Sequence, residues 1–499
     1  MLFNSYLFIF IFLPLVLITY FQLENYRKYH WGICWLIFAS FVYYGWWKPQ
    51  FLLLLFGSIL ANAIFGKILC SGGRYAKSYR SAVVATGIAF NLGVLAFFKY
   101  TDFFVANVDD LLGFDFALPN ILLPIGVSFI TFQKIAFLVD AYRGQVKQFS
   151  VRNFSLFVTF FPQLIAGPIV HHAEIIPQFS KKRDPTTRSE DLAIGWSIFC
   201  LGLFKKVVVA DTCAGYADAG YGLLHSGSSL DLATAWTAVL AYSFQLYYDF
   251  SGYSDMAVGL ARMFGIQFPA NFNSPYKSTG IIEFWRRWHI SLSRFLRDYL
   301  YFPLGGNRYG SIRRYINVMI VMVLGGLWHG ANWVFPVWGA IHGFLLIINH
   351  AWRNLRLSQT SIFNTRMVRR SFVGFTFLTV TLAWIPFRSN TLHGAWQMLN
   401  SLFAIPLDLS SARALLIQFY DLRFAVVWLA VVAAATWVLP NSYQIFRRFN
   451  PVDNLSREQL TSAWAIKKLD WKVTWILAGM FVLSLLHLSH VSPFLYFQF

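Results

Sequence analysis

Charged residues are scarce in this chain of 499 residues. Asp, Glu, Lys and Arg make up 13% of it, and hydrophobic residues make up 57%. A soluble domain carries about 25% charged residues. A soluble chain of this length would also form several domains, and so few charges could not keep several domains in solution. The composition therefore argues against soluble, disordered and fibrous proteins and predicts a protein that crosses a membrane many times.

Cysteine is also scarce, and the common enzyme signatures are absent. The four cysteines lie far apart and form no C-x-x-C pair, so we expect neither a disulfide framework nor a metal site. The sequence has no G-x-S-x-G elbow, P-loop, H-E-x-x-H pair or dinucleotide-binding glycine pattern after a strand. Enzymes that depend on those motifs find no support, and we expect no bound cofactor.

Acidic residues are outnumbered by basic ones. Lys and Arg number 41 against 22 Asp and Glu, which gives a net charge of +19. The basic residues fall in short clusters between apolar runs, as the positive-inside rule predicts, so we expect no nucleic-acid partner. One cluster contains no acid and should face the cytoplasm: Arg353, Arg356, Arg366, Arg369 and Arg370. The connector 99–118 has four aspartates and one lysine and fits the opposite side.

Apolar runs long enough to cross a bilayer recur along the chain, since a span needs about 17–25 residues. About a dozen candidates, giving some 11–12 spans, occur at 3–21, 31–47, 51–69, 81–98, 119–139, 192–210, 233–262, 314–328, 333–350, 371–387, 422–440 and 471–488. The run 314–328 is short and predicts a partial or tilted crossing. Without internal repeats or a low-complexity linker, residues 1–499 read as a single all-α membrane domain, a polytopic helical bundle.

Two further apolar segments are interrupted. Residues 154–179 contain Pro162, Gly167, Pro168 and Pro177, which break a straight helix. Residues 281–304 contain four arginines among aromatic residues. Broken or charged backbone at membrane depth persists only where protein or a water-filled cavity covers it. Both segments are predicted to be re-entrant or interfacial parts of a buried site.

The strongest candidate for chemistry lies in residues 315–350, which contain no Asp, Glu, Lys or Arg. His329 lies there among Gly325, Gly326 and Gly330. A buried imidazole stays neutral near pH 7 and can accept a proton from a hydroxyl group, so His329 is a candidate general base. A hydrogen bond between helices is the alternative interpretation of this histidine.

A second candidate group is basic and lies in residues 283–298. It consists of Arg286, Arg287, Arg294 and Arg297. A guanidinium cluster suits a donor with phosphate groups, such as coenzyme A. An interfacial helix on anionic lipid explains the arginines equally well, although it explains His289 beside Ser291 less well.

The third group is acidic and lies in the run 233–262. Asp249 and Asp255 are acids within or at the end of an apolar helix and need partners, for which nearby arginines are the obvious candidates. Structural pairing is the favoured role over contact with a substrate. Lys205 and Lys206 are expected to mark a span end at the membrane interface, with Asp211 as a cap.

Long combined motifs resemble one known family. EFWRRWHISLSRFLRDYLYFPLGGNR (283–308) and LGGLWHGANWVFPVWGAIHG (324–343) closely resemble the membrane-bound O-acyltransferase (MBOAT) family, in particular its bacterial alginate O-acetylation branch. Six further stretches agree: LPIGVSFITFQ (123–133), FFPQLIAGPIV (160–170), GLFKKVVVAD (202–211), FSGYSDMAVGLARMFG (250–265), NFNSPY (271–276) and FLYFQF (494–499). The resemblance therefore covers nearly the whole chain.

The resemblance implies a helical fold around a tunnel across the bacterial inner membrane. Its catalytic histidine falls on His329, and the second histidine of this branch falls on His289. Trp328, Asn332, Asp249 and Asp255 are expected along the tunnel. The implied reaction moves an acyl group, expected to be acetyl from acetyl-CoA, from the cytoplasmic face toward a periplasmic or membrane-anchored partner that O-acetylates an alginate-like exopolysaccharide.

Two other functions stay open. Another branch of the same family transfers D-alanine toward teichoic acid from a carrier protein, which the arginines would dock. A proton-coupled transporter without acyl chemistry would instead use His329, Asp249 and Asp255 as a proton relay.

Overall fold

A computed structural model of the chain describes residues 1–26, 29–71, 75–113, 118–146, 148–179, 185–355, 360, 365–404, 422–490 and 494–495. Arg356 and residues 496–499, which carried part of the sequence argument, lie outside the described residues. The described part of the chain is built of helices and contains no strand. The all-α class is therefore confirmed.

Seven helical stretches of the described residues are long and apolar enough to cross a membrane: Phe8–Asn25, Phe51–Leu69, Lys77–Leu112, Thr186–His225, Gly310–His329, Val334–Asn354 and Arg366–Arg388. Two shorter apolar helices are α19 (Leu422–Val438) and α21 (Trp471–His487). The chain is thus a multi-pass membrane protein, although by this criterion it has fewer spans than the eleven or twelve expected. The run 119–139 shows one reason, because Pro119 and Pro124 keep its first part non-helical and α5 (Val127–Tyr142) begins only afterwards.

Two helices extend beyond the apolar runs that predicted them. Helix α14 (Gly310–His329) has 20 residues and is long enough for a full span, whereas the tilted crossing stays a prediction. Helix α4 (Lys77–Leu112) has 36 residues and continues into the predicted connector 99–118 as far as Leu112. No glycine or proline stands between Lys99 and Leu112 to end it, Asp110 is exposed, and Asp102 accepts a hydrogen bond from the Ile121 backbone at 3.0 Å.

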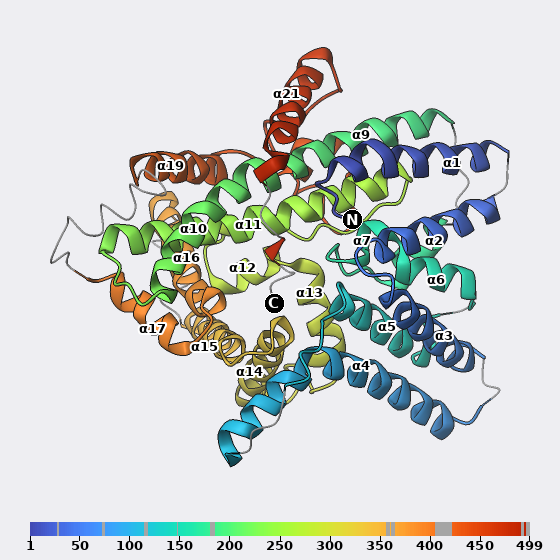
Figure 1. The fold of residues 1–499 in the computed structure, drawn as a ribbon, viewed down its shortest axis with the longest axis horizontal. Helices are drawn as coiled ribbons and strands as arrows, with labels where there is room; N and C mark the ends of the chain where they lie inside the picture. The colour runs from blue at the N-terminus through green and yellow to red at the C-terminus, as the bar shows by residue number, and fades with distance from the viewer. Residues whose placement is uncertain are drawn as a thin grey trace.

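Helices α9 (Pro185–Phe204) and α10 (Asp211–His225) follow one another in one long helical stretch, and both pack along α11 (Leu232–Met263) across the molecule (Figure 1). Between α9 and α10 the short segment η2 (Lys205–Ala210) is a π-helix. The close contact of α9 with α11 depends on glycine: a Cβ at Gly202 would lie 2.6 Å from the Gly252 carbonyl oxygen. Small residues of this kind let two membrane helices pack backbone to backbone.

The N-terminal and C-terminal halves flank the two broken segments. In Figure 1, α1 (Leu13–Asn25), α2 (Tyr29–Gly45), α3 (Phe51–Leu69) and α4 to α7 gather at one end, and α15 (Val334–Asn354), α16 (Arg366–Arg388), α17 (Leu392–Ser401) and α19 at the other. Short helices lie between them: α12 (Ile281–Arg287), α13 (Ile290–Leu296) and the π-helical segment η4 (Arg297–Tyr301).

The breaks predicted in the two interrupted segments are confirmed except at Pro177, which lies inside the helix His172–Phe179 and does not interrupt it. Residues 154–179 are divided among α6 (Val151–Thr159), α7 (Phe161–Leu164) and α8 (His172–Phe179), and residues 281–304 are divided at Trp288 and His289. Most of this backbone is buried by surrounding helices, as broken backbone in a membrane protein must be.

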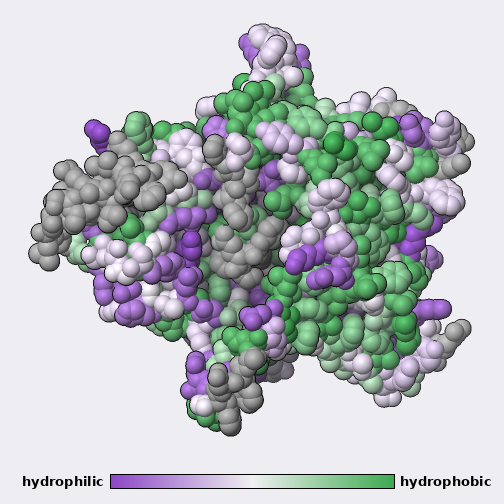
Figure 2. Space-filling view, in the orientation of Figure 1, coloured by the Kyte–Doolittle hydropathy of each residue, from purple (hydrophilic) through white to green (hydrophobic). Residues whose placement is uncertain are grey.

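The surface over the N-terminal helices is largely apolar. Figure 2 shows hydrophobic side chains spread over this half, with hydrophilic side chains in smaller patches there and more widely in the other half. Leu53 is 80% exposed and Phe56 is 60% exposed, both on α3. Extended apolar surface of this kind is what contact with lipid chains requires.

Candidate active site

His329 is the last residue of α14 and is buried, with 7% of its surface exposed. Three aromatic rings surround the imidazole: Trp328 at 5.0 Å, Trp338 at 5.2 Å and Phe387 at 5.1 Å between ring centroids. These rings come from α14, α15 and α16, so His329 lies where three helices meet. The setting keeps bulk water from the imidazole and favours its neutral form.

Glycines beside His329 let α14 and α15 approach closely. A Cβ at Gly326 would lie 2.2 Å from the carbonyl oxygen of Phe335, and one at Gly330 would lie 2.0 Å from the Phe335 ring. Any larger side chain at either position would push the two helices apart. The small residues around His329 therefore set how closely α14 packs against α15, the helix that carries Trp338.

Lys99 and Tyr100 of α4 cap the end of the helix that carries His329. Lys99 Nζ donates hydrogen bonds to the carbonyl oxygens of Trp328 at 2.6 Å and His329 at 2.8 Å. The Tyr100 hydroxyl donates to the Leu327 carbonyl at 2.8 Å. The last carbonyls of a helix have no partner within the helix and carry partial negative charge, so an ammonium group there stabilises the helix end.

His289 lies at the break between α12 and α13 and is 1% exposed. Its backbone is in the left-handed region, with φ at +43°, a conformation that costs energy for a residue other than glycine and often marks functional sites. Burial lowers the pKa of its imidazole to about 3, so the ring is neutral near pH 7.

Asn271 orients the His289 ring. Its side-chain oxygen lies 3.1 Å from His289 Nδ1 and also accepts hydrogen bonds from the Ser291 backbone at 3.2 Å and hydroxyl at 2.9 Å. An amide oxygen only accepts, so Nδ1 carries the proton and Nε2 carries the lone pair. The Trp328 ring lies between the two histidines, with its centroid 6.5 Å from that of His289.

The four arginines of the 283–298 stretch do not form one cluster. Arg287 pairs with Glu283 at 2.7 Å, Arg294 pairs with Glu174, and Arg297 pairs with Asp298 at 2.7 Å. Arg286 instead lines a cavity beside α15 and α16. Their expected role in holding donor phosphates stays a prediction.

The tunnel candidates fall in different surroundings. Trp328 stacks on Phe132 at 5.0 Å and lies beside both histidines. Asn332 holds the connection after α14, because its side chain donates to the Asn390 carbonyl at 2.8 Å and accepts from the Val334 backbone at 3.1 Å. Among the described residues, no group of three His, Cys, Asp or Glu is placed to hold a metal ion.

A family model described as "MBOAT, membrane-bound O-acyltransferase family" matches residues 9–387. The chain belongs to the membrane-bound O-acyltransferase family. It is 42% identical over 431 residues to the "Peptidoglycan O-acetyltransferase" of Helicobacter pylori, covering 81% of this chain and 80% of that protein. It is 38% identical over 513 residues to a "Probable alginate O-acetylase AlgI" of Pseudomonas putida, covering 100% of both chains.

A more distant relative is the "Teichoic acid D-alanyltransferase" of Streptococcus thermophilus, 28% identical over 298 residues, which cover 54% of this chain and 69% of that protein. The family and its O-acetylating relatives establish this protein as an O-acyltransferase.

The two buried acids of this acyltransferase pair with lysines, so the arginine partners expected from the sequence are wrong. Asp249 lies 2.5 Å from Lys206, and Asp255 lies 2.6 Å from Lys205. Lys206 also pairs with Asp211 at 2.7 Å, and its side chain is 2% exposed. Lys206 therefore lies inside the bundle, because the turn of η2 points it toward α11, and its expected place at a membrane interface stays a prediction.

Sequence reasoning missed two residues of the candidate site. Lys99 was assigned to a connector because it follows an apolar run. A single lysine with apolar residues on both sides could instead have indicated a buried lysine within one long helix. Asn271 appeared only within the NFNSPY stretch, and nothing local connects it with His289, which is 18 residues away.

We expect Lys99→Met to lower the maximal rate of acyl transfer about tenfold with little change in KM. Hydrogen bonds from a charged donor contribute about 1.5–3 kcal/mol, and a loss of about 1.4 kcal/mol of transition-state stabilisation is a tenfold rate change. The measurement is kcat and KM for the donor with purified protein. Lys99→Arg keeps the donor and should recover most of the rate, whereas a Met variant with an unchanged kcat contradicts the positioning role.

We expect Asn271→Leu to act through His289. The change removes the acceptor that fixes the imidazole, and we expect it to lower kcat about fivefold, against about tenfold for His289→Ala. Residues that act as one unit are not additive, so the double variant should match His289→Ala alone. Losses that multiply in the double variant would show that Asn271 acts independently. Melting temperatures of all three variants provide the control for folding.

Proposed function

We propose that this O-acyltransferase takes an acetyl group from a thioester at the cytoplasmic face and transfers it to a hydroxyl acceptor reached from the opposite face. The observation that carries the proposal is the position of His329: a buried imidazole at a capped helix end, enclosed by Trp328, Trp338 and Phe387. The O-acetylating relatives support acetyl as the group that is moved.

His329 acts as the general base in this proposal. Its neutral ring takes the proton of the acceptor hydroxyl while the hydroxyl oxygen attacks the thioester carbonyl. The new C–O bond forms, the C–S bond breaks, and the departing thiolate receives the proton from the imidazolium, so His329 returns to its starting state. A brief acyl-imidazole intermediate on His329 is the other form that this chemistry takes. His289 orients the donor or assists the proton transfer.

Acetyl-CoA is the proposed donor. Its phosphates cannot cross hydrocarbon, whereas a small neutral acyl group can, so the charged donor stays at the cytoplasmic face. The proposed attraction comes from Arg287, Arg294 and Arg297, since Arg286 of the same segment lines the separate cavity beside α15 and α16. An apolar, aromatic surround such as that of His329 protects a thioester from hydrolysis.

The proposed location is the bacterial inner membrane, and the proposed onward partner is a periplasmic or membrane-anchored O-acetyltransferase. The full-length relatives named as alginate O-acetylases support an exopolysaccharide as the final acceptor. The 42% relative named as a peptidoglycan O-acetyltransferase supports a second candidate polymer, peptidoglycan, with the same acetyl chemistry.

The identity of the donor distinguishes acetyl transfer from D-alanyl transfer. The more distant relatives are named as teichoic acid D-alanyltransferases. The test uses purified protein in liposomes with labelled acetyl-CoA outside and an acceptor alcohol or polymer fragment inside. We expect label on the enclosed acceptor and free CoA outside. If no CoA is released while a D-alanyl-loaded carrier protein is consumed, the acetyl proposal is wrong and D-alanyl transfer replaces it.

A further inference from the structure

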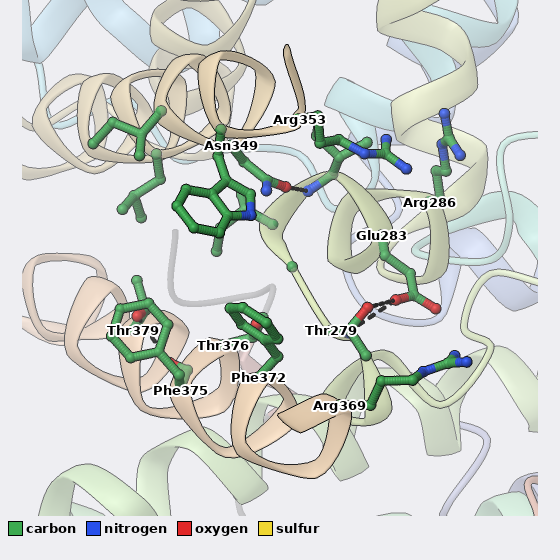
Figure 3. A pocket seen from close by; sticks show the side chains of 16 residues that line it. Thr279, Glu283, Arg286, Asn349, Arg353, Arg369, Phe372, Phe375, Thr376 and Thr379 are labelled. Carbon is green, nitrogen blue, oxygen red and sulfur yellow. Dashed lines mark hydrogen bonds between the residues drawn. The ribbon is translucent and has the colours of Figure 1, made fainter. Parts of the chain in front are cut away.

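A cavity of about 940 Å³ lies between α15, α16 and residues 279–286 (Figure 3). Ligand pockets commonly have about 300–1,000 Å³, so this cavity has room for a large molecule. None of the histidines discussed above lines it. The cavity is thus separate from the aromatic shell of His329, which consists of Trp328, Trp338 and Phe387.

The walls of the cavity are apolar and open outward. One face of α15 supplies Leu345, Ile348 and Trp352, and one face of α16 supplies Phe372 and Phe375. Ile348 is 48% exposed and Phe375 is 68% exposed. In a membrane helix such exposed apolar side chains face lipid chains, so the groove opens laterally toward the bilayer.

Buried aromatic side chains next to Glu283 in the chain are not part of the groove. The Trp285 indole donates a hydrogen bond to His342 Nδ1 at 3.3 Å, and the Phe284 and His342 rings stack with centroids 6.3 Å apart. Both Phe284 and His342 are 0% exposed. The described residues that line the groove include neither these three nor Trp328, Trp338 and Phe387 around His329.

Three arginines gather at the other end. Figure 3 shows Arg286, Arg353 and Arg369 at one end of the cavity, with the aromatic side chains toward the opposite end. None of the three forms an ion pair with a described residue, whereas Glu283 between them is held by Thr279 at 2.9 Å and 2.7 Å and by Arg287 at 2.7 Å. The end of the groove is thus positively charged. Glu283, the acid among the described residues that line it, already accepts hydrogen bonds from Thr279 and Arg287.

We propose that this groove binds an anionic glycerophospholipid. The lipid phosphate lies among Arg286, Arg353 and Arg369, and an acyl chain lies along α15 and α16. Guanidinium groups bind phosphate with two parallel hydrogen bonds, and basic clusters at the cytoplasmic side of a membrane helix attract anionic lipid. Coenzyme A offers similar phosphates, but its polar arm would lie against Ile348 and Phe375, so the apolar wall favours the lipid.

The test is a binding titration of the purified full chain in detergent with phosphatidylglycerol, followed by native mass spectrometry. We expect the double variant Arg353→Gln/Arg369→Gln to weaken phosphatidylglycerol binding at least tenfold, and phosphatidylcholine to bind weakly to both proteins. The matched control is Arg447→Gln/Arg448→Gln, a basic pair outside the groove, which should change the affinity less than twofold. Melting temperatures confirm that each variant is folded.

A second variant keeps the charges and fills the apolar end. Thr379→Trp places an indole where the acyl chain is expected, so it should weaken phosphatidylglycerol binding while all three arginines remain. Unchanged binding in both the Thr379→Trp and the double arginine variant overturns the proposal. Displacement of the lipid by free coenzyme A, in proportion to its concentration, also overturns it and assigns the groove to the donor.

Discussion

Replacing His329 with alanine is expected to lower acetyl transfer about 10²–10⁴-fold, the range that general acid–base catalysis contributes. The imidazole is the group proposed to take the acceptor proton, and its shell of Trp328, Trp338 and Phe387 offers no second base. The measurement is the initial rate of labelled product in the liposome assay. Because an alanine in this shell leaves only a small void, the protein should remain folded, with a melting temperature close to that of the wild type.

The matched control for this change is His393→Ala. His393 is on α17, is exposed, and is absent from the aromatic shell. We expect this variant to keep the wild-type rate within about twofold, since surface changes away from a site rarely exceed about 0.5 kcal/mol. An active His329→Ala enzyme would remove His329 from the mechanism. A variant that moves substrate without forming product would favour the transporter alternative.

Replacing Lys206 with methionine is expected to destabilise the protein by about 3–5 kcal/mol, the usual cost of leaving a buried charge without its partner. Lys206 lies between Asp249 at 2.5 Å and Asp211 at 2.7 Å, and the exposed fractions of these side chains are 2%, 2% and 4%. Methionine has nearly the same length, so it fills the space while removing the positive charge. The two carboxylates then have to be protonated or reach water.

The measurement is the thermal stability of the protein in detergent, compared with the triple variant Lys206→Met/Asp211→Asn/Asp249→Asn. Removing all three charges avoids the unpaired carboxylates, so the triple variant should recover much of the lost stability. A Lys206→Met protein as stable as the wild type would mean that the carboxylates are neutral in the folded state. A triple variant no better than the single one would assign the loss to packing.

The fold class was predictable because it depends on composition and on the length of apolar runs. Pro162, Gly167 and Pro168 also predicted a broken segment correctly, since a proline lacks the N–H that a helix interior needs, whereas Pro177 of the same segment lies inside α8. The full length of α14 was less predictable. Arg313 and Arg314 lie near its start. A prediction from the length of apolar runs ends the span at these charges, whereas the helix itself begins earlier, at Gly310.

His329 was singled out by the sequence alone, because an ionisable residue within 36 uncharged residues is visible without any structure. Asp249 was also recognised as a buried acid that needed a partner. The identity of that partner was not predictable, since Lys206 and Asp249 are 43 positions apart and meet only because α9, η2 and α11 pack together.

The sequence by itself determined an all-α membrane protein and most of its broken segments, and it singled out His329 as the candidate catalytic residue. The tertiary structure decided that Lys99 caps α14, that Asn271 orients His289, and that Arg286 joins Arg353 and Arg369 instead of the other arginines of its own segment. The physical reason is the distance along the chain over which each effect acts. Hydropathy and helix breaking act between neighbours in the chain, whereas each of these arrangements depends on which helices lie against one another in space.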